Sequence, residues 1–178
     1  MAVFKKTEIQ LEHKFDSKTC RHTLNGRVSV LHCHHYASLY SQLADDCGML
    51  DGKKLLAEVT EDTFSAVLAD YYEEYAICDV ADRISIAEQY FAATGLGKMK
   101  VTCAGPESGA VVLEQSHVDL GWVKKWGQRD KPVNFIGCGY IAGMFAAVFG
   151  KSTRSFHVKE TQSIVSGAEQ SLFSVVAN

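Results

Sequence analysis

Four residues whose side chains can bind metal stand in a row near the N-terminus: His32, Cys33, His34 and His35. Imidazole and thiolate are good ligands for zinc, iron, nickel or copper. Neighbouring residues on a strand point to opposite faces, so a continuing strand brings only alternate residues together. A helix that begins near His34 would break this alternation and turn Cys33 or His35 toward Tyr36 and Tyr40 on its inward face. We therefore expect a strand-to-helix junction, with at least two of the four side chains facing one pocket or interface.

This histidine cluster leaves three interpretations open. It could hold a transition metal, with further ligands supplied after folding or across a dimer by His13, His22, Cys47, His117, His157 or Glu114. It could instead be a polar patch that contacts a ligand, or a solvated strand end with no chemical role. A Cys–His nucleophile at Cys33 is disfavoured, because no oxyanion-hole motif and no orienting Asn or Asp is recognisable nearby.

The sequence predicts a β-hairpin before the histidine cluster and helices after it. Asn25-Gly26 predicts a tight hairpin turn before the cluster. Tyr36, Leu39, Tyr40 and Leu43 recur at helical spacing after it, and Gly48 is placed to end that helix. Helical spacing continues over residues 51–77, with a possible break at 60–63, and again over residues 81–94.

The second half of the chain is richer in β-forming residues. Residues 99–104 and 110–118 predict a hairpin around the turn-forming sequence GPESG. Residues 134–149 are apolar on all sides and predict a buried helix whose N-terminus lies near Asn134. The tail predicts two strands joined around Ser166-Gly167. Together these elements indicate an α+β fold in which an antiparallel sheet packs against a helical layer.

Composition narrows the class of protein. The 178 residues carry a net charge of −3 with both signs interspersed, which argues against nucleic-acid binding. No apolar run is long enough for a membrane span, and the start lacks a secretory signal. Six scattered cysteines without a CxxC pair suit reduced thiols. We expect one cytoplasmic domain over residues 1–178, without membrane or nucleic-acid partners.

The C-terminal third resembles a known family. Gly139-Tyr140-x-x-Gly143, Gly150, and Glu160-x-x-Ser163-x-x-x-Gly167-x-x-x-Ser171-x-Phe173 are similar to the C-terminal signature of the 4-vinyl reductase domain, also called the hydrocarbon-binding domain. The resemblance runs from about Val111 to Val176. It implies a fold like that of the TRAPP vesicle-tethering subunits and the haem-based nitric-oxide sensors, and a homodimer. Members of the family include sensor domains of aromatic-responsive transcription activators and accessory proteins of bacteriochlorophyll synthesis.

The resemblance also implies where a zinc site would lie. In the phenol-sensing members one glutamate and three cysteines hold zinc, and the glutamate and two of the cysteines follow the pattern E-x2-C-x7-C. Here Glu160 is present, but Ser163 and Ser171 stand at those two cysteine positions, and the third falls at Asn134. A serine hydroxyl is a poor zinc ligand beside a thiolate. We therefore expect no structural zinc at Glu160.

In a fold of this kind the helical aromatic residues would line an apolar pocket. The candidates for contact with a ligand are Tyr36, Tyr40, Phe64, Tyr71 and Tyr75. The favoured function is binding of a small hydrophobic, aromatic or tetrapyrrole-like ligand by a sensor or accessory domain that acts through a partner protein, without catalysis. The alternatives are a metal-dependent enzyme or metal-delivery protein centred on the histidine cluster, and a structural assembly subunit. The sequence identifies no cofactor.

Overall fold

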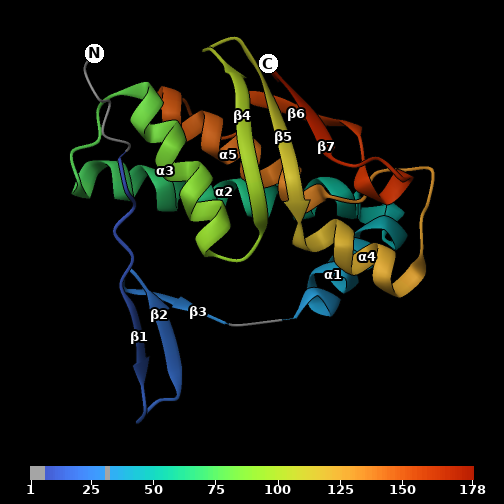
Figure 1. The fold of residues 1–178 in the computed structure, drawn as a ribbon, viewed down its shortest axis with the longest axis horizontal. Coiled ribbons are helices and arrows are strands. Elements are labelled where there is room, and N and C mark those ends of the chain that lie inside the picture. The colour runs from blue at the N-terminus through green and yellow to red at the C-terminus, as the bar shows by residue number, and fades with distance from the viewer. Residues whose placement is uncertain (1–6, 31–32) are drawn as a thin grey trace.

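The computed structural model describes residues 7–30 and 33–178. Its main sheet has four antiparallel strands in the order β4–β5–β7–β6 (Figure 1). These strands are β4 (Gly97–Ala104), β5 (Ser108–Ser116), β6 (Phe156–Gln162) and β7 (Ser171–Ala177). The hairpin predicted around GPESG is the β4–β5 pair. The last strand of the chain, β7, lies inside the sheet between β5 and β6.

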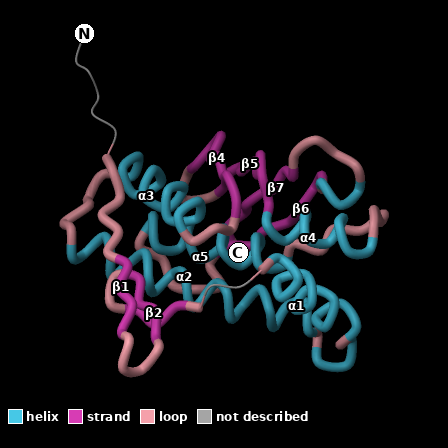
Figure 2. Tube along the Cα trace, turned by 60° about the horizontal axis from the view of Figure 1, so that its bottom comes forward, coloured by secondary structure: helices cyan, strands magenta, loops and turns pink. Residues whose placement is uncertain are grey.

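Helices pack on one face of this sheet. They are α1 (His34–Asp46), α2 (Gly52–Glu74), α3 (Val80–Ala93), α4 (His117–Trp126) and α5 (Phe135–Phe149). α5 lies between the sheet and α2, and α1 lies at the edge away from the sheet (Figure 2). The α+β class predicted from the sequence, with an antiparallel sheet and a helical layer, is therefore confirmed.

The central helix α5 is built for close packing. Asn134 caps its N-terminus by accepting a hydrogen bond from the Gly137 N–H at 2.8 Å, as the predicted helix start requires. A Cβ atom on Gly139 would lie only 2.2 Å from the Ala57 carbonyl oxygen on α2. Glycine at this position therefore lets the two helix backbones approach each other closely.

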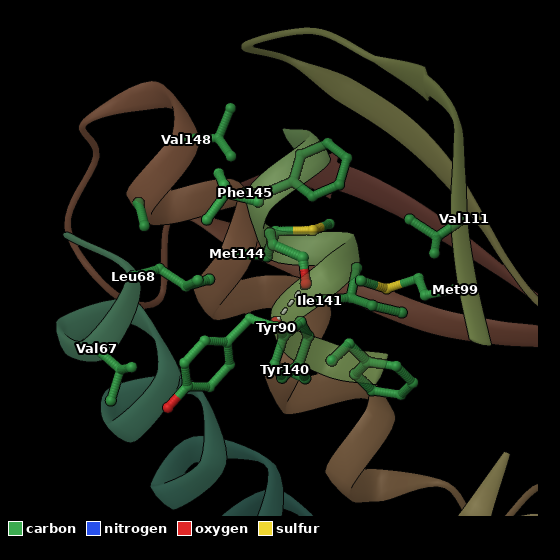
Figure 3. Packing of buried hydrophobic residues seen from close by; sticks show 14 of the residues in the cluster. Val67, Leu68, Tyr90, Met99, Val111, Tyr140, Ile141, Met144, Phe145 and Val148 are labelled. Atoms are coloured by element: carbon green, nitrogen blue, oxygen red, sulfur yellow. Dashed lines mark hydrogen bonds between the residues drawn. The ribbon is translucent and has the colours of Figure 1, made fainter. Parts of the chain in front are cut away.

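The core fills the space between α5 and its neighbours. Side chains from α2, α3, α5 and the sheet interdigitate there (Figure 3). Tyr140 is fully buried, and its hydroxyl donates to the Ala87 carbonyl of α3 at 2.7 Å. This hydrogen bond satisfies the one polar group that Tyr140 brings into the core.

A second, smaller sheet projects away from the helices (Figure 1). It consists of β1 (His13–Asp16), β2 (Arg21–Leu24) and β3 (Arg27–Ser29), all antiparallel. Asn25 and Gly26 both have positive φ at the turn between β2 and β3, as predicted. An ion pair between Arg27 and Asp70 and a hydrogen bond from the Gln10 N–H to the Tyr71 hydroxyl tie the base of this sheet to α2.

Two predicted boundaries were wrong. α2 has no break at residues 60–63, because Thr60 and Thr63 donate to helix carbonyls four residues earlier instead of capping a new helix. α1 ends at Asp46 with Cys47 as its C-cap, so Gly48 does follow the helix end, where it opens a short 3-10 turn (Gly48–Leu50). β5 ends at Ser116, where the hydroxyl accepts from the Asp119 N–H and starts α4, a helix the sequence reasoning missed. None of the described helices is long and apolar enough to cross a membrane.

Candidate functional site

The histidine cluster lies at the N-terminus of α1. His32 is outside the described residues, and Cys33 is the residue that precedes the first helical turn. The Cys33 sulfur lies 3.8 Å from Nδ1 of His35, and the His34 ring lies beside those of His35 and His117. α1 therefore begins at His34, and Cys33 and His35 approach each other across its first turn. The predicted strand-to-helix junction includes His32 and so lies partly outside the described residues.

Among the three described members of the cluster, His34 is the most enclosed. Its Nε2 atom is buried without a hydrogen-bond partner among the described residues. Burial lowers the pKa of His34, and the nearby His35 and Lys124 lower it further. No group of three or more His, Cys, Asp or Glu side chains within residues 7–30 and 33–178 is arranged to hold a metal ion. A metal at the cluster stays a prediction that involves His32.

The predicted ligand-binding aromatics do not share one pocket. Phe64 packs in the core against Tyr140 and Tyr90. Tyr71 is buried and stacks on Tyr75 near the small sheet, with ring centroids 4.4 Å apart. These residues therefore belong to two separate aromatic groups.

The expected inward face of α1 was wrong. Tyr36 and Tyr40 point outward and are 54% and 47% exposed. The buried face instead carries small residues, namely Ala37, Ser38, Ser41 and Ala44. The reason is the close approach of α4: a Cβ on Gly121 would lie 2.7 Å from the Ser38 hydroxyl, so only small side chains fit between the two helices.

A compact polar cluster is buried where α4, α5 and the end of the sheet meet. Six residues with 0–7% exposure form it: Ser116, Asp119, Asn134, Glu160, Ser163 and Ser171. Four of them are the positions that the family resemblance connects with zinc. Ser116 and Asp119 come from the start of α4 and were not predicted. The Ser-x-x-Asp spacing of a helix N-cap was the available signal for them.

Hydrogen bonds orient one carboxylate of the cluster. Oδ2 of Asp119 accepts from Nδ2 of Asn134 at 3.1 Å and from the Ser171 hydroxyl at 3.2 Å. Within the described part of the chain, Oδ1 of Asp119 and both carboxylate oxygens of Glu160 form no hydrogen bond of good geometry. The Ser163 and Ser171 hydroxyls and the Asn134 backbone N–H still lie close enough to Glu160 to stabilise its charged form.

The electrostatics of the cluster are set by burial. Burial raises the pKa of the Glu160 carboxyl to about 7, and the neighbouring Asp119 carboxylate adds to the rise. The hydroxyls of Ser163 and Ser171 lower the pKa of Glu160 in part. Burial also raises the pKa of Asp119, against hydrogen bonds from Ser116, Asn134 and Ser171. Both carboxyl groups therefore bind protons more readily than they would in water.

This donor set does not fit a structural zinc ion. Structural zinc sites are built mainly from thiolate and imidazole ligands, whereas the cluster offers carboxylates, hydroxyls and an amide and has no thiolate. The Asn134 side chain is already engaged as helix cap and as donor to Asp119. The nearby thiol of Cys138 has its pKa raised to about 12 by burial, so it does not supply a thiolate.

A pocket of about 640 Å³ opens beside this cluster, between α2, α5 and β6. Its apolar wall comes from Phe135, Cys138, Gly139, Ala142, Phe156 and Val158. Charged side chains, among them Lys53, Lys54, Glu58 and Arg154, stand at its other side. The pocket thus combines an apolar surface with a polar edge, as small-molecule sites commonly do.

No protein-family model and no curated protein matches the sequence. Solved structures do match the fold. The phenol-responsive sensory domain of the transcription activator PoxR, crystallised with phenol, superposes with a TM-score of 0.76 at 16% identity, covering 93% of this chain and 84% of that chain. This chain has its fold.

Two further structures share the fold more distantly. One is trafficking protein particle complex subunit 3 from Naegleria fowleri, covalently bound to palmitic acid, with a TM-score of 0.54, 15% identity and coverage of 80% of this chain and 90% of that chain. The other is a vinyl-4-reductase family protein from Methanocaldococcus jannaschii, with a TM-score of 0.54, 16% identity and 84% coverage of both chains. The fold relations implied by the C-terminal signature, to vinyl reductase and TRAPP proteins, are thus confirmed.

Proposed function

We propose that this chain is a ligand-binding domain that holds a small hydrophobic or aromatic molecule and acts as a sensor or accessory domain through a partner protein. The observation that carries the proposal is the match over 93% of the chain to a sensory domain that binds phenol. A larger, tetrapyrrole-like ligand is a variant of the same proposal. The domain would bind its ligand without transforming it.

The pocket between α2, α5 and β6 is the ligand site that we propose. Its volume of about 640 Å³ lies within the range of small-molecule sites. Phe135 and Phe156 would contact the apolar body of the ligand, and the charged edge would contact its polar group. Phe64 and Tyr71 belong to α2, but their side chains pack in or against the core and do not line this pocket, so they would support the site without touching the ligand.

Phenol binding measured by calorimetry tests the proposal. Val158 is half-buried on the pocket wall, so Val158→Trp should fill the pocket and weaken phenol binding at least tenfold. Val176→Trp is the matched control, because Val176 is exposed on the neighbouring strand β7. Equal affinity in both variants would contradict the pocket assignment, and no binding of phenol or of palmitate by the wild type would contradict the function.

We further propose that the chain works as a homodimer through α1. Tyr36, Leu39, Tyr40 and Leu43 form an outward apolar stripe, each 39–54% exposed. Monomeric proteins rarely leave such a continuous patch in water. The stripe is self-complementary: in an antiparallel pair centred between Leu39 and Tyr40, each tyrosine faces a leucine of the other copy. A two-fold axis requires this kind of matching.

Sedimentation velocity tests the dimer. The wild type should sediment at twice the chain mass of 19.6 kDa, and Leu39→Asp should sediment as the monomer. Leu120→Asp provides the control, because Leu120 is also an exposed leucine, at 48% against 39% for Leu39, and lies on a different helix, α4. A monomeric wild type at micromolar concentration, or dissociation by both variants alike, would contradict this interface.

A further inference from the structure

The buried polar cluster contains more negative charge than its surroundings balance. Asp119 and Glu160 are 0% and 7% exposed, and neither forms an ion pair with a described residue. Lys159, next to Glu160 in the sequence, is exposed, and the alternation along β6 points it to the opposite face of the strand. Arg154 forms ion pairs with Glu58, Glu61 and Asp62 instead. A buried carboxylate without a counter-charge costs several kcal/mol, so a pair of them needs a cation or protons.

The unpartnered oxygens of the two carboxylates mark the place for such a group. Among the residues that the structure describes, none forms a well-aligned hydrogen bond with Oδ1 of Asp119 or with either oxygen of Glu160, although almost all buried polar atoms in proteins have a partner. Glu160 has only the weaker interactions with Ser163, Ser171 and the Asn134 backbone that lower its pKa in part. Asp119 is held through its other oxygen by Asn134 and Ser171. Fixing one oxygen of a carboxylate while leaving the other free is how neighbouring residues orient a metal ligand.

The chemistry of the donors selects the type of ion. The main donors of the cluster are the carboxylate oxygens of Asp119 and Glu160, because the hydroxyl oxygens of Ser163 and Ser171 already accept hydrogen bonds from backbone N–H groups. The cluster has no thiolate or imidazole. Ca²⁺ and Mg²⁺ prefer such oxygen ligands, and Ca²⁺ accepts a carboxylate through both oxygens. We propose that Asp119 and Glu160 bind a hard divalent cation, Ca²⁺ or Mg²⁺, at the position where the resemblance implies zinc in phenol-sensing relatives.

The pocket between α2, α5 and β6 comes close to the site. Cys138 and Val158 line this pocket. Val158 precedes Glu160 by two residues on β6, so the two side chains point to the same face of the strand. Cys138 lies close enough to Glu160 for the carboxylate to raise the pKa of the thiol. The carboxylate oxygens themselves are buried, so we infer that an ion would reach them from this pocket after a small movement of the side chains between them.

Metal titration of chelator-treated, tag-free protein tests this proposal. Calorimetry with CaCl₂, MgCl₂ and ZnCl₂ at pH 8 should give one saturable Ca²⁺ or Mg²⁺ site per chain, and the ion should raise the melting temperature. Asp119→Asn and Glu160→Gln should each weaken binding at least tenfold. Asp130→Asn, which removes an exposed acid, should leave binding unchanged. No saturable binding up to about 10 mM, well above the dissociation constants of protein calcium sites, would overturn the proposal.

A luminescence signal from the site itself can be measured on the wild type, so this test does not require the substituted proteins to fold. Trp122 is buried one helical turn after Asp119 on α4. Tb³⁺, a hard ion that luminesces when a nearby tryptophan transfers energy to it, should therefore luminesce in the wild type, and Ca²⁺ should displace it. Luminescence that Ca²⁺ leaves unchanged, or a site that binds Zn²⁺ but neither Ca²⁺ nor Mg²⁺, would overturn the assignment. These measurements do not involve phenol. A negative result would therefore refute the cation site without refuting the proposed ligand-binding function.

Discussion

Replacing Glu160 by glutamine should change how stability depends on pH. In chelator-containing buffer the folded wild type holds a proton on Glu160 that the unfolded chain releases, because the pKa is raised from 4.5 to about 7. The free energy of unfolding should therefore fall as pH rises from about 4.5 to about 7. Below about pH 4.5 and above about pH 7, the titration of Glu160 should no longer change the free energy of unfolding. Glu160→Gln is neutral at every pH and should lack this fall.

The size of the effect follows from the same pKa values. A tenfold change in proton affinity is worth about 1.4 kcal/mol, so a rise from 4.5 to about 7 corresponds to about 3 kcal/mol. Because Glu160 is almost fully buried, solvent screening reduces this figure little. At pH 8 without metal, Glu160→Gln should thus be more stable than the wild type by up to about 3 kcal/mol. Burial also raises the pKa of Asp119, so this carboxyl adds to the fall in the free energy of unfolding of the wild type as pH rises.

Urea denaturation at half-unit pH intervals measures this difference. Glu169→Gln serves as the control, because Glu169 is an exposed acid in the loop before β7 and should behave like the wild type. A wild-type stability that stays flat from pH 4.5 to 8 would refute the reasoning. So would a Glu160→Gln protein that is less stable than the wild type at pH 8.

Two further substitutions test the packing that holds the site. Tyr140→Phe removes the buried hydrogen bond to the Ala87 carbonyl and should cost about 1–3 kcal/mol in urea denaturation, since that carbonyl loses its side-chain partner. Gly139→Ala places a Cβ 2.2 Å from the Ala57 carbonyl and should cost about 1–3 kcal/mol by forcing α2 and α5 apart, whereas Gly48→Ala, with open space around it, should change stability little. Near-equal stability of the two alanine variants would contradict the close packing of α2 and α5.

The parts of the fold that could be predicted are those with a strong local pattern. Residues 135–149 are apolar on every side, follow a capping asparagine and are followed by Gly150. A buried helix is the structure that fits this pattern. Asn25-Gly26 likewise specifies a turn through backbone conformations that few other residue pairs adopt. By contrast, α4 was missed because its N-cap follows a strand directly, with no turn residues between them.

Which face of α1 is buried could not be predicted from its sequence pattern. The periodic Tyr36, Leu39, Tyr40 and Leu43 correctly predict a helix with one apolar face, and it was natural to expect that face to be buried within the chain. The structure buries the opposite face, because α4 approaches too closely at Gly121 for large side chains. Periodicity identifies an apolar face but not what covers it.

The same missing helix explains what the sequence could not show about the polar cluster. The resemblance pointed to Asn134, Glu160 and the two serines, which the structure buries in one cluster, and the absence of thiolates there argued against zinc. The inference stopped at a partly lost metal site because Asp119 is not one of the residues of the quoted signature. Once α4 brings Asp119 against Asn134 and Ser171, the cluster has a second buried carboxylate. It therefore gains the charge that an oxygen-liganded cation needs.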